Sequence, residues 1–207
     1  DTSGAVVIPA KFQSVSPFVN GLAIVSRSNR VGFINKKGTE VVPLKYTDAE
    51  PFSQGVAVVE FQGKYGLVSR SGREIVPPIY DDLGSASDKV CYAANKSGYG
   101  YISLNGEVAI DFKFTSASDM RNGYAIVRNA SGVGVIDSNG VYVINPNFEW
   151  IGHEGEELFR VKSDQLFGVI SVGGDTVLKP KYRFVGDLKS GRRLVVKEGS
   201  YGYLDSA

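Results

Sequence analysis

Residues 55–80 of the chain read GVAVVEFQGKYGLVSRSGREIVPPIY, and this stretch decides the fold. It contains three short apolar runs, at 55–60, 64–68 and 74–77, which are separated by turns at 61–63 and 69–72. At the second turn, other parts of the chain carry Asn105-Gly106 and Asn139-Gly140. Asn and Gly tolerate the positive φ angles that tight hairpins require. The stretch therefore predicts short antiparallel strands joined by hairpins.

The same pattern returns every 34 residues along the whole chain, without insertion or deletion. We use the word column for the positions that this interval relates. Two columns hold glycine in every copy: Gly32, Gly66, Gly100, Gly134, Gly168 and Gly202 in one, and Gly4, Gly38, Gly72, Gly106, Gly140 and Gly174 in the other. Another column is always aromatic: Phe12, Tyr46, Tyr80, Phe114, Phe148 and Tyr182. So regular an interval predicts six copies of one structural unit.

Each copy reads as three or four short strands, and no segment has the spacing of an amphipathic helix. Pro43 and Pro77 close the third apolar run of their copies. Because proline removes an amide donor, we expect this strand to lie at a sheet edge or to stop there. The stretch that follows, at 46–49 in one copy, is either a fourth short strand or a packed turn, and the sequence leaves both alternatives open. The predicted fold class is all-β.

Both faces of each predicted sheet are apolar. Neighbouring strand positions, such as Val58 and Val59, or Ile75 and Val76, are both apolar, although adjacent strand side chains point to opposite faces. A sheet with one solvated face would instead alternate apolar and polar residues. Sheets stacked face to face around an axis, as in the blades of a propeller, cover both faces.

The two ends of the sequence indicate ring closure. The chain starts late in a repeat and ends early in one, so that the sixth copy is split between residues 1–14 and 188–207. In a ring, the first strand can complete the last blade and leave no open edge. We therefore expect one repeat domain spanning 1–207, a closed propeller-like ring, with an open β-repeat array as the alternative.

Composition narrows the function classes. The chain has 23 Lys+Arg against 22 Asp+Glu, a net charge of +1, so we expect no nucleic-acid partner. No apolar run is long enough to span a bilayer. With one His and one Cys, the sequence offers no metal site, and we expect no cofactor. Because the sequence begins at Asp1 rather than Met, we expect a processed N-terminus.

One copy carries a pattern that resembles a known family. Phe52-x-x-Gly55-x-Ala57-x-Val59, then 64–68 reading KYGLV, then Gly72-x-x-Ile75-Val76-Pro77-x-x-Tyr80, is similar to the bacterial WG-repeat (KWG-repeat) family. The chain departs from the family at its Trp, because the residue before the glycine is Val31, Tyr65, Tyr99, Val133, Phe167 or Tyr201. The resemblance implies an interaction or scaffold module and supplies no catalytic residues.

Candidate binding residues lie where the copies diverge. Trp150 and His153 fall in the least regular stretch, which we expect to be a surface loop, and Trp150 is either a packed residue or a candidate anchor for a partner. Basic residues gather in the last copy, among them Arg183, Arg192 and Arg193. The acidic Glu154, Glu156 and Glu157 lie about one repeat earlier, and on adjacent copies the two groups can neutralise each other.

Catalytic alternatives find little support in the sequence. His153 beside Glu154 could act as a general base, but a surface histidine among acidic neighbours is the commoner arrangement. Cys91 shares its column with Ala23, Ala57 and Ala125, which predicts a small buried residue rather than a nucleophile. Asp48 and Asp82 could pair as in glycosidases, but their column holds Ser, Trp and Phe elsewhere.

These patterns favour a non-enzymatic binding or scaffold module for a protein or peptide partner. A glycan-binding module with shallow sites between repeats is the first alternative, and a hydrolase with a central site is the second.

Overall fold

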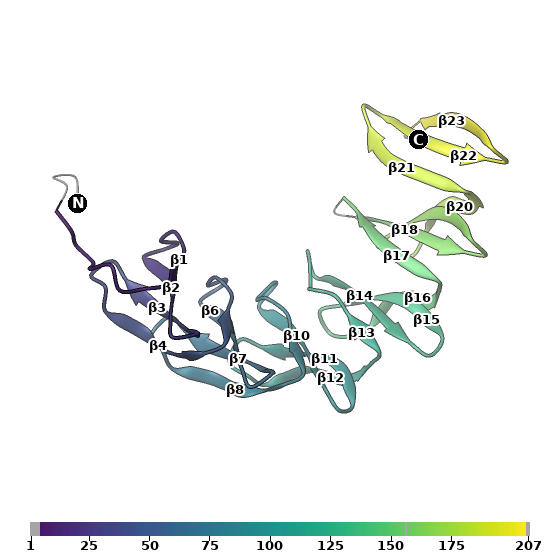
Figure 1. The fold of residues 1–207 in the computed structure, drawn as a ribbon. Helices are drawn as coiled ribbons and strands as arrows, with labels where there is room; N and C mark the ends of the chain where they lie inside the picture. Colours follow the sequence, from purple (N-terminus) through teal and green to yellow (C-terminus); the bar gives the residue numbers. More distant parts are fainter. Residues whose placement is uncertain (1–4, 156, 206–207) are drawn as a thin grey trace. The chain divides into compact units, whose positions relative to one another are not determined.

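The computed structural model describes residues 5–155 and 157–205, and these residues form 23 β-strands and no helix (Figure 1). Within this described part of the chain, no helix is available to cross a membrane. The strands form six small antiparallel sheets, which confirms the predicted fold class. The chain divides into two compact units, residues 1–113 and 114–207, and each is described by itself.

The first unit contains three four-stranded sheets with the same strand order. The first sheet consists of β1 (Ser14–Val15), β2 (Leu22–Arg27), β3 (Arg30–Asn35) and β4 (Glu40–Tyr46). The second consists of β5 (Asp48–Ala49), β6 (Val56–Phe61), β7 (Lys64–Ser69) and β8 (Glu74–Tyr80). The third consists of β9 (Asp82–Leu83), β10 (Val90–Asn95), β11 (Gly98–Ser103) and β12 (Val108–Phe114). The stretch at 46–49 thus ends one sheet and begins the next.

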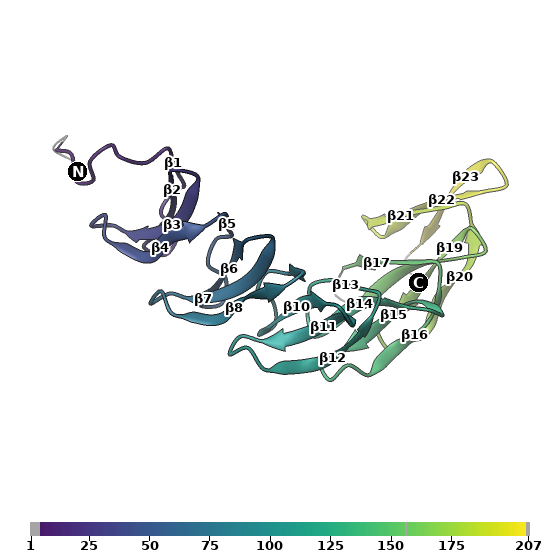
Figure 2. The same cartoon turned by 60° about the horizontal axis from the view of Figure 1, so that its bottom comes forward.

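The second unit contains the other three sheets. One consists of β13 (Ser116–Ala117), β14 (Tyr124–Asn129), β15 (Gly132–Asp137) and β16 (Tyr142–Phe148). The next consists of β17 (Trp150–Glu154), β18 (Leu158–Ser163), β19 (Leu166–Ser171) and β20 (Thr176–Tyr182). The last consists of only β21 (Phe184–Lys189), β22 (Arg192–Lys197) and β23 (Ser200–Asp205), which lie side by side in Figure 2.

The proline-bearing strand is the edge strand of its sheet, as predicted, but it continues beyond the proline. In β4 the pairing with β3 shifts register on both sides of Phe33. Opposite this irregularity lies Gly32, where a Cβ atom would come within 2.5 Å of the Val42 carbonyl oxygen. The glycine column therefore exists because the backbone of the edge strand lies too close for any side chain.

Apolar residues from neighbouring sheets pack face to face within each unit. In the first unit, Phe33 and Val42 of the first sheet pack against Ala57, Val59 and Val68 of the second. All five are essentially inaccessible to solvent, and so are Val58 and Leu67 on the opposite face of the second sheet, so both faces of this sheet are covered as predicted. Cys91 is buried as well, as its column predicts.

Ring closure is not detected. The last sheet has three strands, and among the described residues no fourth strand pairs with β23. Residues 5–12, which we expected to complete that sheet, contain no strand. Closure and the single 1–207 domain therefore stay predictions.

Candidate functional site

The last two sheets expose two aromatic side chains at one column of the repeat. The column reads Ser14, Asp48, Asp82, Ser116, Trp150 and Phe184. Trp150 is 44% exposed and Phe184 is 46% exposed, so neither ring is part of a core. Only the last two copies therefore present an aromatic side chain at this position.

Each of these rings lies beside a glycine two residues further along its strand. A Cβ atom on Gly152 would come within 2.3 Å of the Trp150 ring, and one on Gly186 within 3.4 Å of the Phe184 ring. Residues two apart in a strand share a face, so the glycine makes room for the ring. The aromatic–x–glycine combination thus lets a large ring lie against the strand.

The two rings border a hollow of about 430 Å³ in the second unit. Its lining consists of Trp150, Arg160, Lys162, Phe167, Phe184 and Val185. The Trp150 and Phe167 rings meet edge to face, with their centroids 6.1 Å apart. Lys162 lies opposite Trp150 on β18, and its Nζ atom is 5.7 Å from the centre of the Phe167 ring. The hollow therefore combines aromatic walls with a positively charged border.

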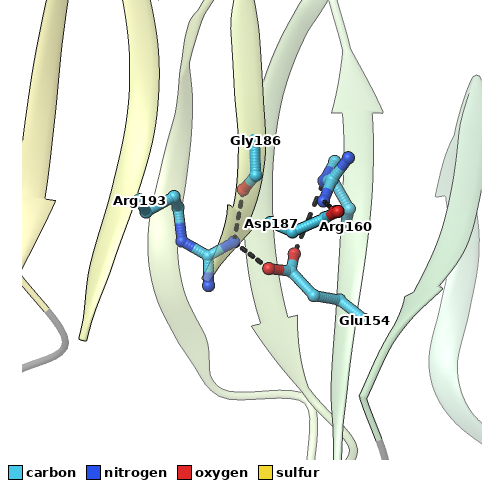
Figure 3. Close-up of polar contacts among 5 residues, drawn as sticks. All are labelled: Glu154, Arg160, Gly186, Asp187 and Arg193. Carbon is cyan, nitrogen blue, oxygen red and sulfur yellow. Dashed lines mark hydrogen bonds and ion pairs between the residues drawn. The ribbon is translucent and has the colours of Figure 1, made fainter. Parts of the chain in front are cut away.

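A network of charged side chains lies beside this hollow (Figure 3). Arg160 donates a 2.7 Å hydrogen bond to Asp187 and lies 3.4 Å from the Glu154 carboxylate. The same carboxylate accepts a hydrogen bond from Arg193, which also donates to the Gly186 carbonyl oxygen at 3.1 Å. The side chains of Glu154 and Arg193 are each only 8% exposed. This is a buried ion pair between β17 and β22.

The charged residues of this network replace apolar ones in the other copies. Glu154 shares its column with Phe18, Phe52, Ala86, Met120 and Leu188. Arg193 shares its column with Ala23, Ala57, Cys91, Ala125 and Phe159, and Arg160 with Ile24, Val58, Tyr92, Ile126 and Leu194. Burying charges costs more than burying apolar groups unless the charges are paired with good geometry. In the last copies, Glu154, Arg160 and Arg193 thus stand in columns that are apolar elsewhere, and each buried charge has a partner of opposite sign.

A second hollow, of about 630 Å³, adjoins the network, since Glu154 and Asp187 belong to its lining. Its lining consists of His153, Glu154, Gly155, Glu157, Leu158, Asp187 and Leu188. Three of these residues are carboxylates, whereas the aromatic hollow is bordered by Arg160 and Lys162. Two of the three carboxylates, Glu154 and Asp187, are already paired with the arginines of the network.

His153 is half-buried and lies in β17, so the prediction that it lies in a surface loop is wrong. Its ring packs on Phe159, with the centroids 5.1 Å apart, and its Nε2 atom has no hydrogen-bond partner among the described residues. Burial, with a smaller contribution from the positive charge of Arg121, lowers the pKa of His153 below its ordinary value. These surroundings favour the neutral imidazole.

The other predicted residues have mixed outcomes. Trp150 lies in strand β17 rather than in a loop, and its column holds the first residue of the first strand in every sheet. Arg183 and Arg192 are exposed, and Arg192 pairs with Asp205 at 3.4 Å. Arg193 is buried and pairs with Glu154, so the predicted neutralisation holds for this pair. Glu156 lies outside the described residues.

Sequence reasoning missed Arg160, Phe167 and Phe184. A signal for two of them was present, because Phe184 and Arg160 depart from the residue type of their columns. What the columns could not show is that β17, β18, β19 and β21 bring these side chains to one hollow. In the described ranges, no three His, Cys, Asp or Glu side chains are grouped closely enough to hold a metal ion.

Comparison with known proteins identifies the repeat. The sequence profile described as "WG containing repeat" matches residues 1–30, 32–65, 65–98, 99–130 and 134–166. The match thus covers most of the chain and ends before β20, so much of the candidate site lies beyond it. None of the curated protein sequences matches the chain.

Several solved structures are similar in fold. A eukaryotic initiation factor matches with a TM-score of 0.53 and 10% identity, over 89% of this chain and 63% of that chain. Kluyveromyces lactis Hsv2 matches with a TM-score of 0.48 and 12% identity, over 90% and 71% of the two chains. The WD40 domain of Neurospora crassa Pan2 matches with a TM-score of 0.42 and 12% identity, over 94% and 75%. At 10% identity the likeness to the initiation factor concerns the fold alone.

Proposed function

The chain belongs to the WG-containing repeat family, and from this premise we propose that it is a non-enzymatic binding module for a protein or peptide partner. The observation that supports the proposal is the column in which Ser and Asp give way to Trp150 and Phe184. Both rings are half-exposed and border one hollow. Large aromatic side chains around a concave, mostly apolar surface are typical of sites where a partner docks.

The lining of the hollow supports a proposal for the chemistry of the partner. Trp150, Phe167 and Phe184 suit an aromatic or long aliphatic side chain. Lys162 at the border suits an acidic group next to that side chain, because its Nζ atom donates a 2.7 Å hydrogen bond to the neutral Gln165 and makes only a loose 3.8 Å ion pair with Glu149. We therefore propose a peptide segment that carries an apolar anchor followed or preceded by an acidic residue.

The proposal is tested by selecting peptides from a random library on the purified chain and measuring their affinity by calorimetry. Trp150→Ser and Phe184→Ser introduce the residue found at Ser14 and Ser116 of the same column. Each variant should weaken a selected peptide about 10-fold or more, as expected for an anchor worth about 2 kcal/mol. Phe18→Ser, which removes a comparably exposed aromatic residue from the first unit, is the matched control. Equal binding by all three variants would contradict the proposal.

A glycan is the second candidate partner, because exposed aromatic faces also stack on sugar rings. The observation that favours it is the same pair of half-exposed rings, Trp150 and Phe184. A glycan array probed with the chain and with Trp150→Ser distinguishes the two. Binding that depends on Trp150, together with no selected peptide, would favour the glycan.

A further inference from the structure

Arg160 belongs both to the aromatic hollow and to the charged network beside it. Its side chain is part of the lining that also contains Trp150 and Phe184. It also donates a hydrogen bond to Asp187 at 2.7 Å and lies 3.4 Å from Glu154 (Figure 3). All of these residues belong to the second unit. A ligand in the hollow would therefore meet a guanidinium group whose present partners are carboxylates of the chain itself.

The fold does not need the charge of Arg160. The other residues of its column are aliphatic or aromatic: Ile24, Val58, Tyr92, Ile126 and Leu194. Glu154, the buried carboxylate of the network, is already paired with Arg193, which donates a hydrogen bond to its Oε1 atom. The Oε2 atom of Glu154 and the Nε atom of Arg160 both lack a hydrogen-bond partner among the described residues, so their contact is loose. If Arg160 turned away, Glu154 would thus keep a cation.

Asp187, the remaining partner of Arg160, holds it only weakly. The side chain of Asp187 is 69% exposed, whereas that of Arg160 is 19% exposed. An ion pair with an exposed carboxylate competes with water and contributes little to stability. The hydrogen bond from Arg160, with smaller contributions from the charges of Lys189 and Arg193, lowers the pKa of Asp187 below its ordinary value. Asp187 is therefore ionised at neutral pH, and another carboxylate can replace it at little cost.

We propose that Asp187 is an internal competitor for an acidic side chain of the partner, and that Arg160 exchanges Asp187 for this group when the partner docks. The inference rests on the proposed function, in which an apolar anchor enters the aromatic hollow, and it names the residue that recognises the neighbouring acidic group. A guanidinium binds a carboxylate through two parallel hydrogen bonds, whereas the ammonium of Lys162 is a point charge. Arg160 thereby selects a carboxylate, and Asp187 keeps the arginine paired in the free chain.

Asp187→Asn is the first test, because it removes the competitor and leaves Arg160 in place. A peptide selected on the wild-type chain should bind this variant about 2- to 5-fold more tightly, which is the value of one exposed ion pair. The same peptide with Gln in place of its acidic residue should bind both chains equally in calorimetry. An Asp187→Asn variant that binds the acidic peptide no more tightly than the wild type would overturn the proposal.

Asp205→Asn is the matched control. It removes the same charge from the second unit and also breaks an exposed pair with an arginine, since Asp205 lies 3.4 Å from Arg192. Because Asp205 is not part of the lining of the aromatic hollow, this variant should bind the acidic peptide as the wild type does. Equal tightening by Asp187→Asn and Asp205→Asn would reduce the effect to net charge and overturn the proposal.

Arg160→Lys tests the arginine itself, because lysine keeps the charge and loses the planar group that binds a carboxylate twice. It should weaken the acidic peptide about 5-fold, as expected for the loss of a charge-assisted bidentate contact. The peptide with Gln should bind this variant and the wild type equally. Equal losses for the two peptides would mean that Arg160 only shapes the hollow, and this would contradict its role in recognition.

The pKa of Asp187, followed by NMR, gives a readout that a merely structural ion pair would not change. In the complex with the acidic peptide, the pKa should rise toward its ordinary value, because the hydrogen bond from Arg160 is the largest cause of its lowering and Lys189 and Arg193 act only through their charge. The peptide with Gln should leave the pKa where it is in the free chain. A pKa that stays equally low in both complexes would show that no exchange takes place.

Failure of this inference can be distinguished from failure of the proposed function. If no peptide is selected, or if Trp150→Ser leaves the binding of selected peptides unchanged, no partner docks in the hollow and both are overturned. If the selected peptides depend on Trp150 but carry no acidic residue, or do not respond to Asp187→Asn, only the roles of Arg160 and Asp187 are overturned.

Discussion

The sheet β5–β8 and the sheet β21–β23 are built from the same repeat, yet in two of their columns the residues differ in charge or in burial. In the first, Ala57 is buried and Leu67 is covered by the edge strand β8. In the second, Arg193 stands in the column of Ala57 and pairs with Glu154, and Tyr203 stands in the column of Leu67 and is exposed. The hairpins β6–β7 and β22–β23 nevertheless pair in the same register.

The comparison shows that the repeat specifies the hairpin, whereas neighbouring elements specify burial. Local turns and strand propensity are enough to form β22–β23, because hairpin register depends on the turn and not on what lies beside the sheet. Whether a side chain of that hairpin is buried, paired or exposed depends on the adjacent sheet and on a fourth strand. The following predictions test whether hairpin formation and side-chain burial are determined separately, starting from the largest expected effect.

Arg193→Ala should have the largest effect on stability. It leaves the Glu154 carboxylate buried without its closest cation, and breaking one side of a buried pair costs about 3–5 kcal/mol. Arg160, at 3.4 Å from Glu154, supplies only part of the compensation. Thermal and urea unfolding of the variant measure the loss.

The matched control replaces both partners. Glu154→Met with Arg193→Phe copies the residues one repeat earlier, Met120 and Phe159, which are both buried. The double variant should recover most of the lost stability, since apolar residues often replace a buried ion pair without cost. A double variant as unstable as Arg193→Ala would mean that the network has a role beyond filling this space.

Gly66→Ala should have the next largest effect on stability. Together with Gly202→Ala, it compares β7, which is paired with the edge strand β8, with β23, which is itself an edge strand of the described sheet. The new methyl group would lie 2.5 Å from the Val76 carbonyl oxygen, so β8 must shift, at a cost of about 1–3 kcal/mol. The equivalent change Gly202→Ala should stay within about 0.5 kcal/mol of the wild type, because the added Cβ atom meets no atom closer than 3.9 Å in the described residues. Equal losses at the two positions in urea unfolding would contradict this explanation of the glycine column.

The pH dependence of His153 should be the smallest effect. Its pKa is lowered in the folded state, so below pH 6.5 the unfolded chain takes up a proton that the folded chain resists. The stability contributed by the neutral ring is therefore complete above pH 6.5 and falls as the pH drops toward the folded pKa. His153→Ser, which copies Ser85 of the same column, should flatten the pH dependence of the melting temperature. An unchanged slope would show that His153 is not its source.

Much of the candidate site could have been found from the columns alone. Trp150 and Arg193 were identified because they break the pattern of the repeat, and Phe184 and Arg160 break it just as clearly. Their grouping could not be predicted, because Trp150 belongs to a strand and not to a loop, and it shares a hollow with Phe167 of β19. The burial of Arg193 could not be predicted either, since a charged residue in a sequence usually indicates a solvated side chain.

The sequence by itself determined the six-fold repeat, the short antiparallel strands, the edge position of the proline strand and the two apolar faces of each sheet. These follow from turn chemistry and from side-chain alternation, which act over a few residues. Only the tertiary structure decided which charges are buried together and which aromatic rings border a hollow. Those outcomes depend on segments that are distant along the chain, and a short stretch of sequence carries no information about which segment will pack against it.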